Sequence, residues 1–228
     1  MLKDIIKKIL EWFRKPTEEQ KPEETKEEPV VDVRQKQNGN GEPLWMPQVL
    51  ADLKRHEGYR EYAYPDPHSE WGRNFPSWKI KWGRRPASVI IEELGLSKDD
   101  VAKGAPWTVG YGFTKGVKYT SRTTHGISTE RLKEEVVEHV KGLDKLVPGW
   151  RTEHSIVVQS VLANLVYNLG ELRLSKFAPT LALFKTKEYA AAAARLRNTA
   201  WYKQVGVRSV ELVERLETGR IRPEHLVK

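Results

Sequence analysis

The sequence predicts an α+β fold, with a small strand-bearing N-terminal lobe followed by a mainly helical C-terminal lobe. The run at 107–112 is short and punctuated by glycines, which is typical of a strand that ends in a turn. From residue 128 onward, apolar residues recur at spacings of three and four, which is typical of helices. A Pro- and Glu-rich stretch separates this domain from an N-terminal helix pattern, so we expect the folded domain at 44–228.

Residues 1–15, MLKDIIKKILEWFRK, have the pattern of an amphipathic helix that stops at Pro16. Charged residues interrupt the apolar face, so the segment lacks the continuous apolar region of a secretory signal. Three interpretations remain open: a helix on a membrane surface, a helix that docks on a partner, or a helix folded back on its own domain. Residues 16–43 contain four prolines and few aliphatic residues, which predicts a disordered linker.

Composition excludes several classes of protein. The 228 residues include no cysteine, which rules out disulfides, thiol nucleophiles and cysteine zinc sites, and no apolar run reaches the ~18 residues of a transmembrane helix. Residues 1–43 carry 9 Lys and Arg against 10 Asp and Glu, whereas 44–228 carry 30 against 21. The folded part is therefore basic. Such a surface attracts nucleic acid, anionic lipid or the anionic polymers of a bacterial envelope, or is simply solvated.

The expected elements follow in chain order. Residues 46–58 have helical spacing, and Gly58 stands where such a helix ends. Residues 59–64 lead into the turn Tyr64-Pro65-Asp66-Pro67, and 68–106 is irregular and rich in tryptophan, with a short helical candidate at 88–94. The remaining predicted helices are 128–146, opened by Ser128, then 155–169, 177–184, 189–197 and 207–217, the last closed by Gly219.

Two carboxylates of the N-terminal lobe, Glu57 and Asp66, are candidates for acid–base chemistry. Glu57 is predicted at the C-terminal end of a helix, where the helix dipole does not favour a negative charge. If Glu57 also packs against apolar neighbours, it keeps its proton near neutral pH and acts as a proton donor. Asp66, in a rigid turn between two prolines, is expected in a wetter place and ionised. Such a division of labour suits glycoside hydrolysis.

The motifs around these carboxylates resemble the active-site lobe of the bacteriophage lysozyme family, glycoside hydrolase family 24. The resemblance rests on the strings His56-Glu57-Gly58, Tyr64-Pro65-Asp66 and Trp107-Thr108-Val109-Gly110-Tyr111-Gly112. Later blocks resemble the family's central buried helix, the helix after it and its closing segment. These blocks are Leu165-Val166-Tyr167-Asn168-Leu169-Gly170, Phe177 to Phe184, and Trp201-Tyr202-Lys203-Gln204 continuing through Arg208 to Gly219.

The resemblance implies a lysozyme-like fold and a muramidase. The implied reaction is hydrolysis of the β-1,4 bond between N-acetylmuramic acid and N-acetylglucosamine in peptidoglycan, without a cofactor or a metal. The implied catalytic residues are Glu57 as general acid, and Asp66 with Thr108 as the groups that position and activate a water. This is the inverting arrangement, which needs the larger separation between carboxyl groups.

The resemblance also implies three residues of the substrate site, namely Tyr111, Asn168 and Arg208. Arg208 is a candidate to pair with Glu57, and the alternative is an ordinary surface arginine. Asn168 either hydrogen-bonds sugar acetamido groups or caps its own helix.

The chain departs from the family pattern at two points. Between Asp66 and Thr108 lie 41 residues where the family has a handful, so the resemblance implies an insertion at about 67–106 that folds over the strand lobe. Phe113 stands where many relatives have His, and we interpret it as a packing change.

The insertion contains Trp71, Trp78 and Trp82 among several basic residues. A mini-core of these tryptophans is the favoured interpretation. A stacking platform for glycan is the second interpretation, and a site for single-stranded nucleic acid is the least favoured. We therefore expect no nucleic-acid partner.

Three functions remain open. The first is a phage muramidase, either an endolysin or a virion lysozyme, that lyses the cell wall at entry or release and is bacteriolytic and antimicrobial. The second is a lytic transglycosylase on the same bond, against which Asp66 and Thr108 count. The third is a structural virion or envelope-binding protein that carries a lysozyme-like domain.

The expected partners are peptidoglycan glycan strands and, through residues 1–15, an anionic membrane surface or a virion protein. We expect a monomeric catalytic domain. It is expected to be synthesised in the host cytoplasm, to act in the periplasm or cell wall, and in one alternative to travel with the virion.

Overall fold

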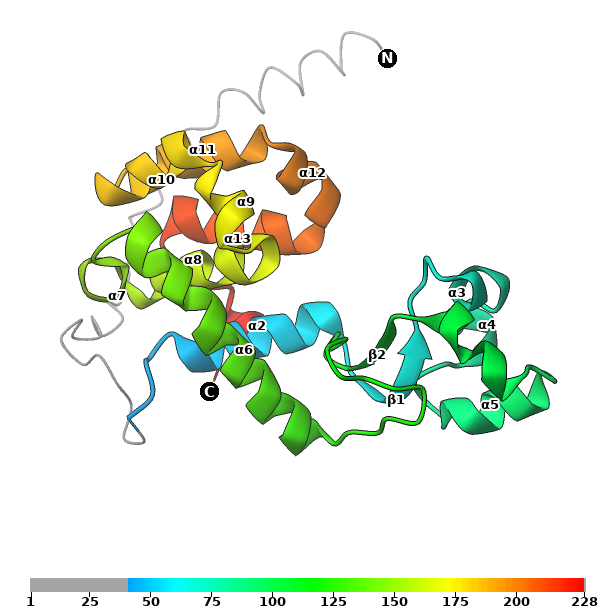
Figure 1. The fold of residues 1–228 in the computed structure, drawn as a ribbon. Coiled ribbons are helices and arrows are strands. Elements are labelled where there is room, and N and C mark those ends of the chain that lie inside the picture. The colour runs from blue at the N-terminus through cyan, green and yellow to red at the C-terminus, as the bar shows by residue number, and fades with distance from the viewer. Residues whose placement is uncertain (1–40, 228) are drawn as a thin grey trace, which may run out of the picture. The chain divides into compact units, whose positions relative to one another are not determined.

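The computed structural model describes residues 41–227 (Figure 1). The predicted amphipathic helix at 1–15 and the predicted linker up to residue 40 lie outside these residues. Within the described part, a small antiparallel sheet with short helices forms one lobe and a group of helices forms the other. The predicted α+β fold class is confirmed.

The sheet of the strand lobe contains β1 (Arg60–Pro65) and β2 (Trp107–Gly110). The two strands are antiparallel, with Tyr64 opposite Thr108 and Pro65 opposite Trp107. The register therefore brings the end of β1, immediately before Asp66, beside the strand that carries Thr108. Between the strands the chain forms four short elements: α3 (Glu70–Asn74), α4 (Ser77–Ile80), α5 (Ala87–Glu93) and the 3₁₀ helix η1 (Lys98–Gly104).

The strand lobe has its own apolar core. Trp107 of β2 contacts Trp71 and Trp82 edge-on, with ring centroids 6.1 and 5.9 Å apart. The indole Nε1 of Trp82 donates to the Phe75 carbonyl at 2.9 Å, so this buried polar group is satisfied. Because Trp71 and Trp82 are buried here, they form a mini-core and neither is a stacking platform for glycan or nucleic acid. The Trp78 side chain lies outside the described part.

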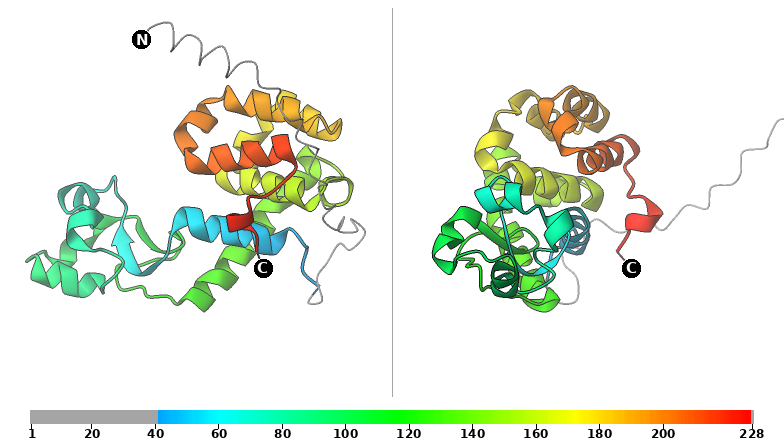
Figure 2. Two further views of the ribbon diagram at one scale, coloured as in Figure 1. Left: turned by 180° about the vertical axis from the view of Figure 1, so that it is seen from behind. Right: turned by 90° about the vertical axis from the view of Figure 1, so that its right-hand side faces the viewer.

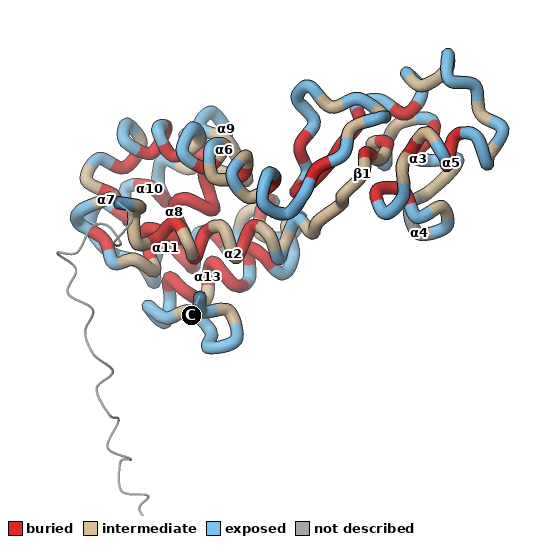
Figure 3. The backbone as a smooth tube through the Cα atoms, turned by 90° about the horizontal axis from the view of Figure 1, so that it is seen from below, coloured by how far each residue is buried: buried red, intermediate tan, exposed pale blue. Residues whose placement is uncertain are grey.

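The helical lobe is built around α8, most of whose residues are buried (Figure 3). Ser155 caps its N-terminus by accepting from Val158 N, and Gly170 follows its last turn. The helices of this lobe are α7 (Trp150–Glu153), α8 (Ile156–Leu169), α9 (Glu171–Ser175), α10 (Ala178–Lys185), α11 (Tyr189–Arg197), α12 (Ala200–Val205) and α13 (Val207–Thr218), followed by the 3₁₀ turn η2 (Pro223–His225).

Two helices connect the lobes, namely α2 (Met46–Glu57) and the long α6 (His125–Leu146) (Figure 1). The prediction that Ser128 opens α6 is wrong: Thr124 caps it, accepting from Ile127 N, and Ser128 is buried in the first turn against Thr123. Both α2 and α13 pack on α8, and α13 runs beside α2 (Figure 2). None of the helices in residues 41–227 combines the length and the apolar character needed to span a membrane.

Candidate active site

Glu57 is the last residue of α2, at the junction of the two lobes. Gly58 ends the helix with a positive φ of 66°, a conformation that glycine adopts readily, and its N–H bonds the Lys54 carbonyl. The other charged residues of this turn are basic, which suits the negative end of the helix dipole. Glu57 is the exception, and Arg208 of α13 compensates for it by donating from Nη2 to Oε1 at 2.5 Å.

The turn after β2 lies against the other oxygen of this carboxyl group. A Cβ on Gly112 would be 3.7 Å from Glu57 Oε2, and Gly112 has a φ of 97°. The glycine therefore lets the strand lobe approach the carboxyl group closely. The Glu57 side chain is 30% exposed and paired with an arginine, so the expected packing of this carboxyl group among apolar neighbours is not what the structure contains.

Asp66 follows β1, and hydrogen bonds to both its N–H and its carbonyl fix its backbone. Its N–H lies within hydrogen-bond distance of the Gly104 and Pro106 carbonyls, and its own carbonyl accepts from Ser69 N and Oγ. A Cβ on Gly72 would lie 1.9 Å from that carbonyl oxygen, so only glycine fits there. Oδ1 accepts from His68 N at 2.7 Å, and no residue in 41–227 donates to Oδ2.

Thr108 and Tyr64 occupy opposite positions in the two strands. Thr108 is buried, and Tyr64 is partly buried. Burial raises the pKa of the Tyr64 phenol, and the charges of Glu57 and Asp66 raise it further against the opposing charge of Arg60. Both carboxylates are therefore within electrostatic range of one phenol. Tyr64 was expected in the turn and motif before Asp66 and was not predicted as a site residue.

An open pocket of about 450 Å³ lies beside Glu57. Asn168 of α8 reaches it, and its Oδ1 accepts from Trp201 Nε1 at 2.7 Å. The Asn168 side chain therefore does not cap α8, whose C-cap is Gly170. Its amide nitrogen has no partner among the described residues and is left to donate. The lining residues are His56, Glu57, Asn168, Val205, Val207 and Arg208.

Three of the six predicted site residues thus line one pocket, namely Glu57, Asn168 and Arg208. Arg208 is only 7% exposed, so the alternative of an ordinary surface arginine is wrong. Asp66 and Thr108 lie on the strand lobe and do not line this pocket. His56, Val205 and Val207 were not predicted as site residues, although all three stand within the blocks that resemble the family.

Tyr111 does not have the position expected of a substrate contact. It is 5% exposed and packs with the core of the helical lobe, and its hydroxyl lies 3.2 Å from His125 Nδ1. We therefore correct Tyr111 from a binding residue to a packing residue of the turn after β2. Phe113 is buried in the same core under the Arg131 guanidinium, at 4.4 Å, as expected of a packing change.

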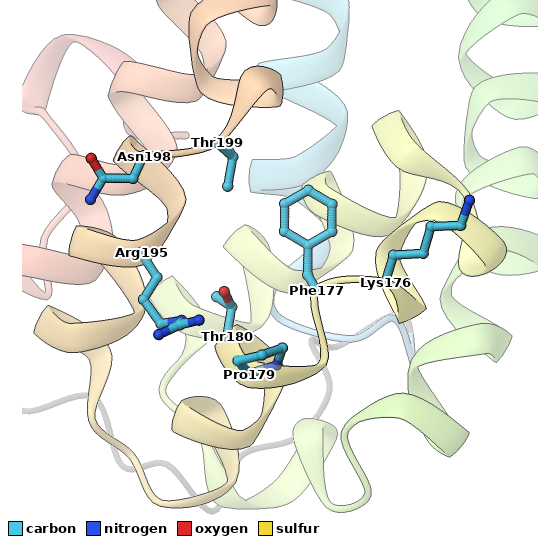
Figure 4. Close-up of a pocket in the computed structure, with 7 residues that line it drawn as sticks. All are labelled: Lys176, Phe177, Pro179, Thr180, Arg195, Asn198 and Thr199. Atoms are coloured by element: carbon cyan, nitrogen blue, oxygen red, sulfur yellow. The ribbon is translucent and has the colours of Figure 1, made fainter.

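A second open cavity, of about 510 Å³, lies in the helical lobe. In Figure 4, Arg195 of α11 points toward Thr180 and Pro179 of α10, and Lys176 lies beyond Phe177. The lining therefore includes two cations. In the described part of the chain, no group of three or more His, Asp or Glu side chains is arranged to hold a metal ion.

Comparison with known proteins finds two similarities. A family model described as "Phage lysozyme" matches residues 92–218. A "Probable T4-type lysozyme 2" from Dictyostelium discoideum is 38% identical over 61 residues, which are 27% of this chain and 36% of that protein. The chain thus aligns with little more than a third of this relative. The family match contains Thr108, Asn168 and Arg208, and it begins after Glu57 and Asp66.

Proposed function

The chain belongs to the phage lysozyme family, and from this premise we propose that it hydrolyses the β-1,4 bond between N-acetylmuramic acid and N-acetylglucosamine in bacterial peptidoglycan. The observation that carries the proposal is the setting of the Glu57 carboxyl group. It stands at the end of α2, is held by a nearly buried arginine, faces a glycine turn of the strand lobe, and lines an open polar pocket.

In the proposed mechanism, Glu57 is the general acid. Arg208 already donates to Oε1, so Oε2 is the oxygen that carries the proton. As the bond between the anomeric carbon and the bridging oxygen breaks, that proton moves from Oε2 to the departing oxygen. The carboxylate that remains is stabilised by the Arg208 guanidinium. The amide nitrogen of Asn168 has no acceptor within residues 41–227 and is suited to donate to an acetamido carbonyl of the sugar.

Asp66, with Thr108, is proposed to activate the attacking water. Oδ1 of Asp66 is occupied by the His68 N–H, and Oδ2 is left to take a proton from the water as it attacks the anomeric carbon. Attack on the face opposite the leaving oxygen makes the enzyme an inverting glycosidase. The pinned backbone of Asp66 supports this role, because a base must be held at a fixed distance from its water.

The products of digestion test the proposal. The expected products are fragments with reducing muramic acid ends, which proton NMR detects first as the α-anomer. Fragments that appear first as the β-anomer would refute inversion while leaving hydrolysis in place. No cleavage of purified peptidoglycan by the full chain would refute the proposed function itself.

A lytic transglycosylase is the second candidate. This reaction requires the acid and no activated water. The observation that favours it is that Asp66 and Thr108 do not line the pocket beside Glu57. This reaction leaves anhydro-muramic ends and no new reducing ends, so mass spectrometry of the same digest separates the two candidates.

Residues 1–15 are proposed to locate the enzyme at an anionic membrane or on a virion protein. Lysines near an anionic surface contribute about 1 kcal/mol each, and this contribution falls with salt. Co-sedimentation of the 1–15 peptide with anionic vesicles at low and high salt tests the membrane alternative. Binding that is strong at low salt and weak at high salt is expected of it, whereas the absence of binding at both would refute it.

A further inference from the structure

Opposite charges alternate along the facing sides of α2 and α13, behind the Glu57 carboxyl group. At the far end, Asp52 pairs with Arg215, and at the pocket, Glu57 pairs with Arg208. Between these two pairs, Glu211 contacts both Arg55 and His56. The facing residues, which we call the ionic ladder, are Asp52, Arg55, His56 and Glu57 on α2 and Arg208, Glu211 and Arg215 on α13.

The pair farthest from the pocket is buried. Asp52 is 1% and Arg215 is 3% exposed. Two parallel hydrogen bonds of 2.5 and 2.9 Å join them, and Gln48 Nε2 donates a further bond of 3.0 Å to Asp52. Bidentate geometry of this kind fixes direction as well as distance. The middle residue, Glu211, is also nearly buried, and His225 of the C-terminal turn lies 3.7 Å from its carboxylate.

The charges of the ionic ladder are complementary at one axial position of α2 relative to α13. Each helix packs on α8 through apolar residues, and apolar cores that keep their volume and pattern lose uniqueness of packing before they lose stability. A slide of one helical turn, about 5.4 Å, would bring like charges together. In one direction Glu211 would face Asp52 and Arg208 would face Arg55, and in the other Glu211 would face Glu57 and Arg215 would face Arg55. Buried polar groups of this kind are known to fix the register of paired helices.

We propose that Asp52, Glu211 and Arg215 are positioning residues for the Glu57 carboxyl group. The ladder sets the axial register of α2 on α13, and this register keeps Glu57 on Arg208 with Oε2 facing the strand lobe. None of the three touches the pocket. The inference rests on the proposed function, because it assigns their purpose to the placement of the general acid.

The competing explanation is that the buried pair only stabilises the fold. Burying two charges costs desolvation, and well-packed apolar replacements of such pairs are often neutral or stabilising. The two explanations therefore differ for the double variant Asp52→Leu with Arg215→Met. If the pair only stabilises, a folded double variant keeps full activity. If the pair sets the register, the double variant folds but places Glu57 poorly.

The first experiment measures kcat and KM of the full chain on soluble peptidoglycan fragments. In the double variant we expect kcat to fall at least tenfold while KM stays within twofold, with a cooperative melting transition retained. The matched control is Glu214→Gln with Arg222→Gln, which removes an exposed ion pair between α13 and the segment that follows it and should leave both constants unchanged. Unchanged kcat in the folded double variant would overturn the proposal.

The second experiment needs no activity. Arg208→Gln is introduced into the wild-type chain and into the double variant, and the change in melting temperature is compared. If the ladder sets the register, Arg208→Gln lowers the melting temperature of the wild type by at least twice as much as that of the double variant. Equal changes in the two backgrounds would overturn the inference even if the wild type cleaves peptidoglycan. An inactive wild type with unequal changes would instead contradict the proposed function alone.

If the double variant does not fold, the single variant Glu211→Gln is measured in its place. This near-isosteric change removes the middle charge and keeps hydrogen-bond capacity toward Arg55 and His56. We expect kcat to fall at least threefold at constant KM, and the effect of Arg208→Gln on the melting temperature to shrink. Wild-type kcat together with an undiminished effect of Arg208→Gln would overturn the proposal.

Discussion

Replacing Glu57 by Gln removes the proposed acid with almost no change in shape. General acid catalysis contributes roughly 10²–10⁴-fold to a rate, which corresponds to about 2.7–5.5 kcal/mol of the activation barrier. The amide can still accept from Arg208 through its oxygen, but it has no proton to give to the leaving oxygen. We therefore expect kcat to fall at least a hundredfold, with KM within a few-fold of the wild type.

The structure also sets the expected loss of stability. Glu57 Oε1 accepts a charged hydrogen bond from Arg208, which is 7% exposed and would keep only a neutral partner. The amide oxygen of the variant still accepts from the charged guanidinium, so the difference between the two chains is the attraction between two opposite charges, which is about 4 kcal/mol at 4 Å near a protein surface before screening. Because the Glu57 side chain is 30% exposed, solvent screening reduces the difference to about 1 kcal/mol. For a domain of this size, that lowers the melting temperature by roughly 2–4 °C.

The assay combines dye-release from labelled peptidoglycan with a thermal melt of the same samples. Glu61→Gln is the matched control, because Glu61 forms an exposed pair with Arg122 in the same lobe and lies outside the pocket. The control should match the wild type in both measurements. Wild-type activity in folded Glu57→Gln would exclude Glu57 as the acid. An unchanged or higher melting temperature would show that its pair with Arg208 does not stabilise the fold.

Three further outcomes are expected. Asp66→Asn should lower kcat at least a hundredfold in the same assay, whereas Asp100→Asn, which removes an exposed charge paired with Lys103, should have little effect. Trp82→Ala should destabilise the strand lobe by about 3–5 kcal/mol, measured by urea unfolding, and a purely kinetic effect would contradict its role in the mini-core. Burial lowers the pKa of the His154 imidazole, and Lys187 lowers it further. The unfolded chain therefore binds more protons as pH falls through about 6.5, so stability should fall on acidification, and His154→Gln should flatten this dependence between pH 7.5 and 5.5. An unchanged slope would refute the assignment to His154.

Long periodic helices were predictable from sequence because their pattern is repeated several times. The prediction of 189–197 matches α11, and that of 155–169 differs from α8 by one residue, the Ser155 cap. Short elements such as α3, α9 and α12 were not predicted, since four to six residues hold too little periodicity to identify a helix. The start of α6 was misplaced because Thr124 and Ser128 are both good caps, and tertiary contacts decide between them.

Motifs that resemble a known family indicated the candidate site residues, but they did not separate accessible side chains from buried ones. Glu57, Asp66 and Thr108 stand in motifs that resemble a known family, whereas Tyr111 stands in the same motif and is a core residue. A motif fixes the backbone path and leaves open which side chains of an alternating strand and turn face solvent. Tyr64 and His56 stand in these motifs but were not predicted as site residues, because their relevance depends on which charges lie near them in space.

The charge pattern of one helix does not identify its partner until the spatial alignment of the two helices is known, and the ionic ladder is an example. On one face of α13, at spacings of three and four, the charged residues are Arg208, Glu211 and Arg215. On α2 the corresponding residues are Asp52, Arg55 and Glu57. In both helices the sign of the charge alternates. Each series alone is typical of a solvated helix face. The two become complementary only when the helices run antiparallel with Asp52 opposite Arg215, a pairing across 163 positions of the chain. Local sequence therefore provided both halves of the pattern, and the packing of both helices on α8 provided the alignment that makes it specific.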